Sequence, residues 1–176
     1  MIIAKQHSAL SGFTYDLYEQ ENKNVGTLCW PDFAVAKNAR LQNPAPDLLS
    51  SKIEIKYNSH LYLVEFEYIT RDWFNDIRFT LMDKGVTLAS ADVINQKKLF
   101  KRPTITITEP FAGEVVRKSG LFAVRYEVIK DRVMQGTVAE KSWFTVKREL
   151  HIDLPSSISS PVQLFIFFLV HNHAYR

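Results

Sequence analysis

Seven apolar residues follow one another without interruption close to the end of the chain, in the stretch LFIFFLV from Leu164 to Val170. A helix needs about 20 predominantly apolar residues to cross a bilayer, so this run is too short to be a transmembrane anchor. It must instead be a buried element of a folded domain. We predict a hydrophobic helix over about residues 158–172, and this helix limits what the rest of the chain can form.

The residues that flank this run are those that begin and end helices. Ser160, Pro161 and Gln163 suit the first turn, where Ser and Gln side chains satisfy free backbone donors. His171 and His173 suit the last turn, where positive charge is favoured by the helix dipole. Between these ends, apolar side chains fall on every side of the predicted helix. A helix without a polar stripe must be surrounded by other elements.

Composition places the chain among ordinary globular proteins. Its 176 residues are 46% hydrophobic and 23% charged, which is enough to bury a substantial core in a single domain spanning 1–176. The one cysteine, Cys29, forms no internal disulfide, and the N-terminal stretch MIIAKQHSALSG lacks the apolar run of a signal peptide. We therefore expect a cytoplasmic protein.

Upstream of the helix, apolar residues recur at every second position, which is typical of half-buried strands. In the stretch SKIEIKY, Ile53 and Ile55 lie on one face, and charged residues lie on the other. Short polar breaks separate such runs, which predicts antiparallel hairpins. About twelve strands are expected, between about residues 13 and 152. Their predicted ranges are 13–19, 25–30, 33–39, 52–57, 60–69, 76–82, 86–92, 104–109, 112–117, 121–129, 132–140 and 143–152.

These strands and the apolar helix fit together best in a closed barrel. A barrel of eight strands is filled by its own side chains, whereas one of about twelve is hollow and has room for a helix. Closure removes the sheet edges, and enclosure keeps water away from the helix. The sequence therefore predicts a mainly β fold, a closed antiparallel β-barrel of about twelve strands around a central hydrophobic C-terminal helix. A β-sandwich with the helix across one opening is the alternative, but it leaves one side of the helix exposed.

The last predicted strand and the helix resemble a known family. In the stretch KSWFTVKRELHIDLPSSISSPVQLFIFFLV, a strand runs through Asp153, Leu154 and Pro155 into a short hydrophobic helix. This resembles the tubby C-terminal-like superfamily, which includes LURP-one-related proteins and phospholipid scramblases. The resemblance implies a closed barrel around a C-terminal helix, and phospholipid binding or a signalling role without assigned chemistry. No stretch matches a lipid-binding or calcium-binding motif of the family, so no functional residue is carried over.

Charge is unevenly distributed along the chain. Residues 1–76 carry 7 basic and 10 acidic side chains, whereas residues 77–176 carry 15 basic and 9 acidic ones, so their net charges are −3 and +6. The overall net charge of +3 is too small to indicate nucleic acid or membrane by itself. We expect any anion-binding surface to lie in the second part of the chain.

The strongest basic run is QKKLFKRP. Its charged and aromatic side chains are Lys97, Lys98, Phe100, Lys101 and Arg102. Such a group suits an anionic membrane surface, because the cations bind headgroups and the aromatic ring enters the headgroup layer. The alternatives are a solvated loop between strands, which is the simpler one, and nucleic-acid binding, which is the least favoured. Four further cations extend the patch if the fold brings them close: Arg117, Lys118, Lys147 and Arg148.

A second candidate site is the stretch ITRDWFND, in which Arg71, Trp73 and Phe74 lie between two predicted strands. As a loop at the rim of a barrel, it offers an aromatic surface to a protein partner. The alternative is that its aromatic side chains close the end of the barrel.

No pattern in the sequence predicts catalysis, a cofactor or a metal. His171 and His173 are two residues apart, which puts them on different sides of a helix, and no second pair of ligands accompanies them. Serine and histidine occur together in QHSALSG, but no nucleophile elbow or phosphate-binding glycine loop is present. We therefore expect a non-enzymatic domain without cofactors, which binds either an anionic membrane surface or a protein partner.

Overall fold

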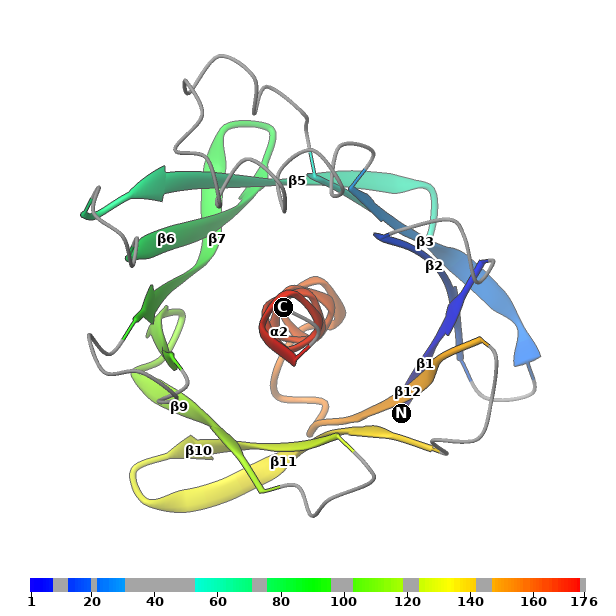
Figure 1. The fold of residues 1–176 in the computed structure, drawn as a ribbon. Helices are drawn as coiled ribbons and strands as arrows, with labels where there is room; N and C mark the ends of the chain where they lie inside the picture. The colour runs from blue at the N-terminus through cyan, green and yellow to red at the C-terminus, as the bar shows by residue number, and fades with distance from the viewer. Residues whose placement is uncertain are drawn as a thin grey trace.

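The computed structural model of the chain describes residues 1–7, 13–19, 22–30, 53–70, 76–95, 103–118, 124–141 and 147–174. These residues form a closed barrel of twelve antiparallel strands, and the helix α2 lies inside it (Figure 1). Each strand pairs with its neighbours in the sequence, and the first strand pairs with the last, so the sheet has no free edge. The predicted mainly β fold, a closed barrel around a central C-terminal helix, is confirmed.

Short hairpins connect many of the strands. The strands are β1 (Ile2–Gln6), β2 (Phe13–Tyr18), β3 (Asn24–Trp30), β4 (Ile53–Tyr57), β5 (His60–Tyr68), β6 (Ile77–Asp83), β7 (Val86–Ile94), β8 (Thr104–Glu109), β9 (Gly113–Arg117), β10 (Arg125–Lys130), β11 (Val133–Glu140) and β12 (Glu149–Asp153). Three hairpins have two-residue turns in which both residues have positive φ, at Asn58 and Ser59, Lys84 and Gly85, and Asp131 and Arg132. Such turns have the twist that two antiparallel strands need.

Eleven of the twelve predicted strand ranges overlap with strands β2 to β12. The remaining range, 33–39, lies outside the described residues. The prediction that the strands begin near residue 13 is wrong, because β1 precedes them and pairs with both β2 and β12. Ile2 and Ala4 of β1 are buried, but this alternation is short and Ala is a weak strand former. β1 is stabilised by pairing with β12, which comes from the other end of the chain. Pairing between such distant segments cannot be recognised from the residues of either segment alone.

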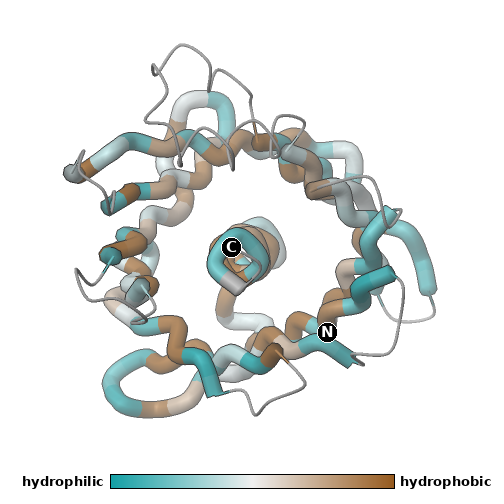
Figure 2. Tube along the Cα trace, viewed as in Figure 1, coloured by the Kyte–Doolittle hydropathy of each residue, from teal (hydrophilic) through white to brown (hydrophobic). Residues whose placement is uncertain are grey.

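α2 (Ser160–Ala174) forms the centre of the core. Every residue from Val162 to His173 is at most 8% exposed, so the helix is dry on all sides. The wall around it alternates between hydrophobic and hydrophilic residues, with the hydrophobic ones buried (Figure 2). Aromatic rings from the wall pack against the helix, and the centroid of the Phe168 ring lies 5.5 Å from that of Phe13 and 5.3 Å from that of Phe79. Among the described residues, no helix has the length and hydrophobicity needed to cross a membrane.

The start of the helix differs in detail from the prediction, and both ends lie two residues later than expected. The Gln163 amide nitrogen donates hydrogen bonds to the carbonyl oxygens of Ile158, at 2.7 Å, and Pro155, at 3.3 Å. The expected role of Gln163, satisfying a free backbone donor, is therefore wrong. Its side chain ties the helix to the turn that brings the chain from the wall into the interior.

The barrel has two mouths. At the α2-start mouth, β12 ends at Asp153 and the chain turns inward to the helix, and the three two-residue hairpin turns lie at this end. At the α2-end mouth, the helix reaches His173 close to Pro103, the residue before β8. Strand direction fixes which segments meet at each mouth, because neighbouring strands are antiparallel throughout.

The central packing is testable by substitution. Phe168→Ala is expected to lower the free energy of unfolding by about 3–5 kcal/mol, because it leaves a cavity where the rings of Phe13, Trp30 and Phe79 meet the helix. Urea unfolding measures this change. Val86→Ala is the control, since Val86 is 63% exposed and its loss should cost no more than about 0.5 kcal/mol. Equal effects of the two substitutions would contradict the central position of the helix.

Candidate functional site

The helix fills the interior of the barrel, and three cavities lined by described residues lie at the mouths and on the outer wall. Their volumes are about 460 Å³ at the α2-start mouth, 410 Å³ at the α2-end mouth and 440 Å³ on the outer wall of β5 and β6. Binding is therefore expected at the mouths and on the wall.

Both candidate sites from the sequence lie outside the described residues. The first set is Lys97, Lys98, Phe100, Lys101 and Arg102, and the second is Arg71, Trp73 and Phe74. The strand ends on either side of these segments are described. β7 ends at Ile94 and β8 begins at Thr104, whereas β5 ends at Tyr68 and β6 begins at Ile77. All four strand ends lie at the α2-end mouth. Both predicted binding sites are therefore flanked by strands that end or begin at this mouth.

A cavity opens in the barrel wall at this mouth, between the start of β8 and the end of β9. Cα pairing of the two strands stops at Ile105 and Val115, although Thr104 and Val116 still belong to strands. The remaining side chains around the cavity come from both strands, from β10 and from the helix end. They are Pro103, Thr106, Glu114, Arg117, Tyr126 and His173. The cavity therefore connects the outer wall with the end of the helix.

His173 and Tyr126 line the inner side of this cavity. His173 Nε2 lies 3.0 Å from the Pro103 carbonyl oxygen, which only accepts hydrogen bonds, so Nε2 carries the proton. In the neutral ring, Nδ1 is then the acceptor, and it receives the hydrogen bond of the Tyr126 hydroxyl over 2.9 Å. The imidazole thereby joins the helix end to β10 and to the residue before β8. Both residues are buried, so these bonds are protected from water.

Basic side chains gather on the β9 to β12 side of the α2-end mouth. They are Arg117, Lys118, Arg125, Lys141, Lys147 and Arg148, and the acidic side chains among them are Glu114, Glu127, Glu140 and Glu149. Some of these charges are paired, since Lys141 Nζ lies 3.1 Å from Glu149 Oε1 and Lys118 Nζ lies 4.0 Å from Glu127 Oε2. Arg125 and Lys147 are exposed. This side of the mouth has an excess of positive charge.

The opposite side of the barrel has the reverse balance. The β4 to β7 wall carries six acidic and three basic side chains, which are Glu54, Glu65, Glu67, Asp76, Asp83 and Asp92 against Lys56, Arg78 and Lys84. Arg78 is held by Asp92, with Nε 2.7 Å from Oδ1, and lies 3.6 Å from Glu67 Oε1. The fold thus converts the uneven charge along the sequence into two walls of opposite sign.

A layer of polar side chains covers the hydrophobic core near the α2-end mouth. Tyr15 and Asn172 are buried, and neither Tyr15 Oη nor Asn172 Oδ1 has a hydrogen-bond partner among the described residues. Burial raises the pKa of Tyr15, and the positive charge of Arg148 opposes this rise. Burial and, to a smaller extent, the positive charge of Arg148 lower the pKa of His171 to about 3, so His171 is neutral near pH 7. Its ring packs between Phe13 and Tyr15, with centroids 4.3 and 4.9 Å away.

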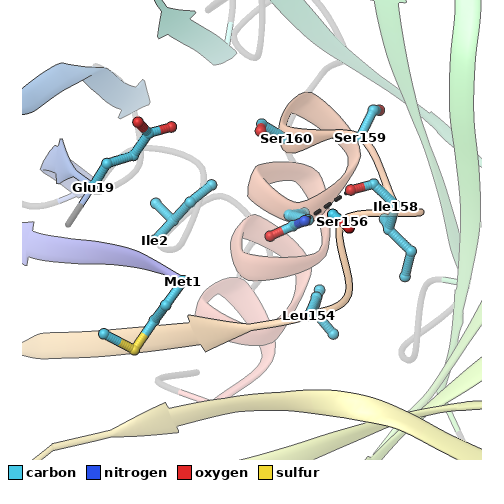
Figure 3. Close-up of a pocket in the computed structure, with 9 residues that line it drawn as sticks. Met1, Ile2, Glu19, Leu154, Ser156, Ile158, Ser159 and Ser160 are labelled. Atoms are coloured by element: carbon cyan, nitrogen blue, oxygen red, sulfur yellow. Dashed lines mark hydrogen bonds between the residues drawn. The ribbon is translucent and has the colours of Figure 1, made fainter.

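The cavity at the α2-start mouth has a different character (Figure 3). Ser156, Ser159 and Ser160 line it near the start of the helix, and Glu19 faces it from the end of β2. The Tyr57 hydroxyl donates a hydrogen bond to Glu19, and burial together with this bond raises the pKa of Tyr57. Because a carboxylate already lies near the positive end of the helix dipole, this cavity has no preference for an anionic ligand.

The two histidines of the helix end have separate surroundings. His171 lies in an aromatic cage, whereas both nitrogens of His173 lie within hydrogen-bond distance of other groups. Within the described parts of the chain, no three side chains of His, Cys, Asp or Glu lie close enough to hold a metal ion.

No local sequence pattern predicts the cavity between β8 and β9. His173 lies 70 residues from Pro103 and 47 from Tyr126, and no local pattern connects them. The sequence predicts Arg117 only as an extension of the basic run. Its place beside Pro103 in one cavity depends on the barrel topology. Comparison of the chain with protein-family models, curated proteins and solved structures found no match.

The buried neutral state of His171 predicts a pH dependence of stability. Its pKa is about 3 in the folded protein and 6.5 for an exposed histidine, so only the unfolded chain takes up this proton between these values. The free energy of unfolding should therefore fall as the pH decreases below about 6.5, with a slope approaching about 1.4 kcal/mol per pH unit.

Urea unfolding of the wild type and of His171→Leu, between about pH 6.5 and pH 5, isolates this contribution. In the variant, the free energy of unfolding should change less with pH, because the contribution of His171 is removed. This comparison does not require the two proteins to be equally stable. If the free energy of unfolding changed equally with pH in the two proteins, His171 would take up its proton in the folded protein as readily as in the unfolded chain, and the account would be wrong.

Proposed function

We propose that this barrel is a non-enzymatic, peripheral binder of anionic phospholipid headgroups, and that it binds through the basic side of the α2-end mouth together with residues 97–102. One observation carries the proposal. The basic run ends at Arg102, and the next residue, Pro103, lines the same cavity as Arg117. The residue that directly follows the basic run therefore lies beside a cation from a different part of the sequence.

Electrostatics makes this mode of binding favourable. Each Lys or Arg near an anionic membrane surface contributes about 1 kcal/mol, and the attraction decreases within a Debye length of about 8 Å at physiological salt. Several cations at one mouth act together, whereas the acidic β4 to β7 wall is repelled and turns away. Association of this kind is reversible and sensitive to salt.

We also propose that the chain belongs to the tubby C-terminal-like superfamily. A closed barrel of twelve antiparallel strands with a hydrophobic C-terminal helix supports this assignment, as does the last strand running into the helix through Leu154 and Pro155. A cytoplasmic location is part of the proposal, with the protein at the surface of the membrane.

A second candidate function is a protein-interaction module that uses residues 68–76. Ile69 is 43% exposed at the α2-end mouth, and its amide donates to the Asp76 carbonyl oxygen over 2.8 Å. The Asp76 carboxylate in turn accepts a hydrogen bond from the Asn95 amide over 2.7 Å. The base of this segment is thereby held in place beside an exposed apolar side chain, which suits contact with a protein.

Co-sedimentation with vesicles distinguishes the two functions. The purified protein is mixed with neutral or anionic phospholipid vesicles at low and moderate salt. We expect binding to anionic vesicles only, weakening at least tenfold as the salt concentration rises to physiological values. A quadruple variant, with Lys97, Lys98, Lys101 and Arg102 each changed to Gln, should lose this binding.

A second quadruple variant is the control, because it removes the same charge from the other end of the barrel. It changes Lys23, Lys56, Lys84 and Lys130, all exposed, to Gln. This control should bind vesicles nearly as well as the wild type. Equal loss in both variants would mean that net charge alone matters, and absence of vesicle binding by the wild type would exclude the lipid proposal and favour a protein partner.

A further inference from the structure

Two features of the barrel near its α2-start end carry exposed apolar side chains that no other described element covers. Six large hydrophobic residues are well exposed among the described ones: Met1, Leu61, Ile69, Val86, Val133 and Met134. Single exposed apolar residues need no explanation, but neighbouring ones form a contact surface. Val133 and Met134 lie together on the β10–β11 hairpin, and Leu61 lies in the groove on the outer wall of β5 and β6.

The β10–β11 hairpin forms a projecting tip, which is residues 130–134. Val133 is 61% exposed and Met134 53% exposed. Successive residues of a strand point to opposite faces, so exposure of both means that neither face of the tip is covered by the barrel. Figure 1 shows this hairpin extending outward from the wall. The charged residues Lys130, Asp131 and Arg132 are also exposed, and they precede the apolar pair.

The groove on the outer wall has a matching character. It has a volume of about 440 Å³ and lies along β5 and the β6–β7 hairpin. Leu61, Leu63 and Met82 provide its apolar surface, and Leu63 is the direct cross-strand neighbour of Met82. The charged side chains around it are Glu65 and Lys84. The groove thus offers an apolar surface with an acidic and a basic group, opposite in sign to Arg132 and Asp131 of the tip.

One molecule cannot place its own tip in its own groove. The strands β7, β8 and β9 separate β10 from β6 around the barrel, and the tip extends away from the wall. Contact between tip and groove must therefore join two molecules through different surfaces. Such a contact either closes as a two-fold dimer, in which each tip enters the groove of the other copy, or leaves one tip and one groove free and continues into a ring or a filament.

We propose that the chain associates with itself, and that the β10–β11 tip of one copy occupies the β5–β6 groove of the next. Val133 and Met134 bury their apolar side chains against Leu61, Leu63 and Met82. The charges of the tip pair with Glu65 and Lys84 at the edges. This inference does not depend on lipid binding, but it is compatible with it, because both surfaces lie away from the α2-end mouth.

Two variants, each defective in one surface, test the proposal. The tip variant carries Val133→Ser and Met134→Ser, and the groove variant carries Leu61→Lys and Glu65→Lys. All four positions are exposed, so both variants should keep the fold, as near-ultraviolet circular dichroism and thermal melting will show. Light scattering after size exclusion gives the mass of each protein across micromolar to sub-millimolar concentrations.

The wild type should show a mass that increases with concentration beyond the 20.3 kDa of one chain. Each variant alone should stay at the mass of one chain, or associate at least tenfold more weakly. An equimolar mixture should form a complex of only two chains, because the intact groove of the tip variant meets the intact tip of the groove variant.

Three results would overturn the proposal. The first is a wild type that stays monomeric at all concentrations, and the second is association that either variant retains unchanged. The third is a mixture that stays monomeric when the wild type associates, because a contact between identical surfaces is not rescued by mixing. Met134→Ser alone serves as the milder tip variant if the double substitution alters the melting curve.

Discussion

A helix without a polar face has to be enclosed, and this requirement determines the architecture. α2 is buried from Val162 to His173, and a closed wall of strands supplies the surroundings. The wall depends equally on the helix, because a barrel of twelve strands is too wide for its own side chains to fill. Rings such as Phe13, Trp30 and Phe79 pack on Phe168 from several directions. Helix and barrel therefore form one cooperative core.

Enclosure of the helix also decides where function is located. Since the interior is occupied, ligands and partners have access to the mouths and to the outer wall. The α2-end mouth combines an excess of positive charge with a cavity that reaches the His173 and Tyr126 pair. At the hairpin end, the described residues Val133 and Met134 form an exposed apolar pair. The two ends therefore differ in character, with an excess of positive charge on one side of the first and an exposed apolar hairpin tip at the second.

Much of the fold could be predicted from the sequence, because its signals are local. The period-two runs predicted the strands, and the unbroken run from Leu164 to Val170 predicted the enclosed helix. What was missed depends on contacts between distant residues. β1 is stabilised by pairing with β12, and the cavity between β8 and β9 forms where Cα pairing stops. Both candidate sites from the sequence lie outside the described residues, although the fold brings their flanking strand ends to one mouth.

The most direct test of the central claim is removal of the helix. A chain that ends after Pro161 lacks Phe165, Phe167, Phe168 and their aliphatic neighbours, and it loses several kcal/mol for each large side chain. This loss exceeds the stability of an ordinary domain. Circular dichroism with thermal melting of the truncated protein should show no cooperative transition. A soluble truncated protein that melts cooperatively, with the β spectrum of the full chain, would contradict the account, because the barrel would then hold together without its central helix.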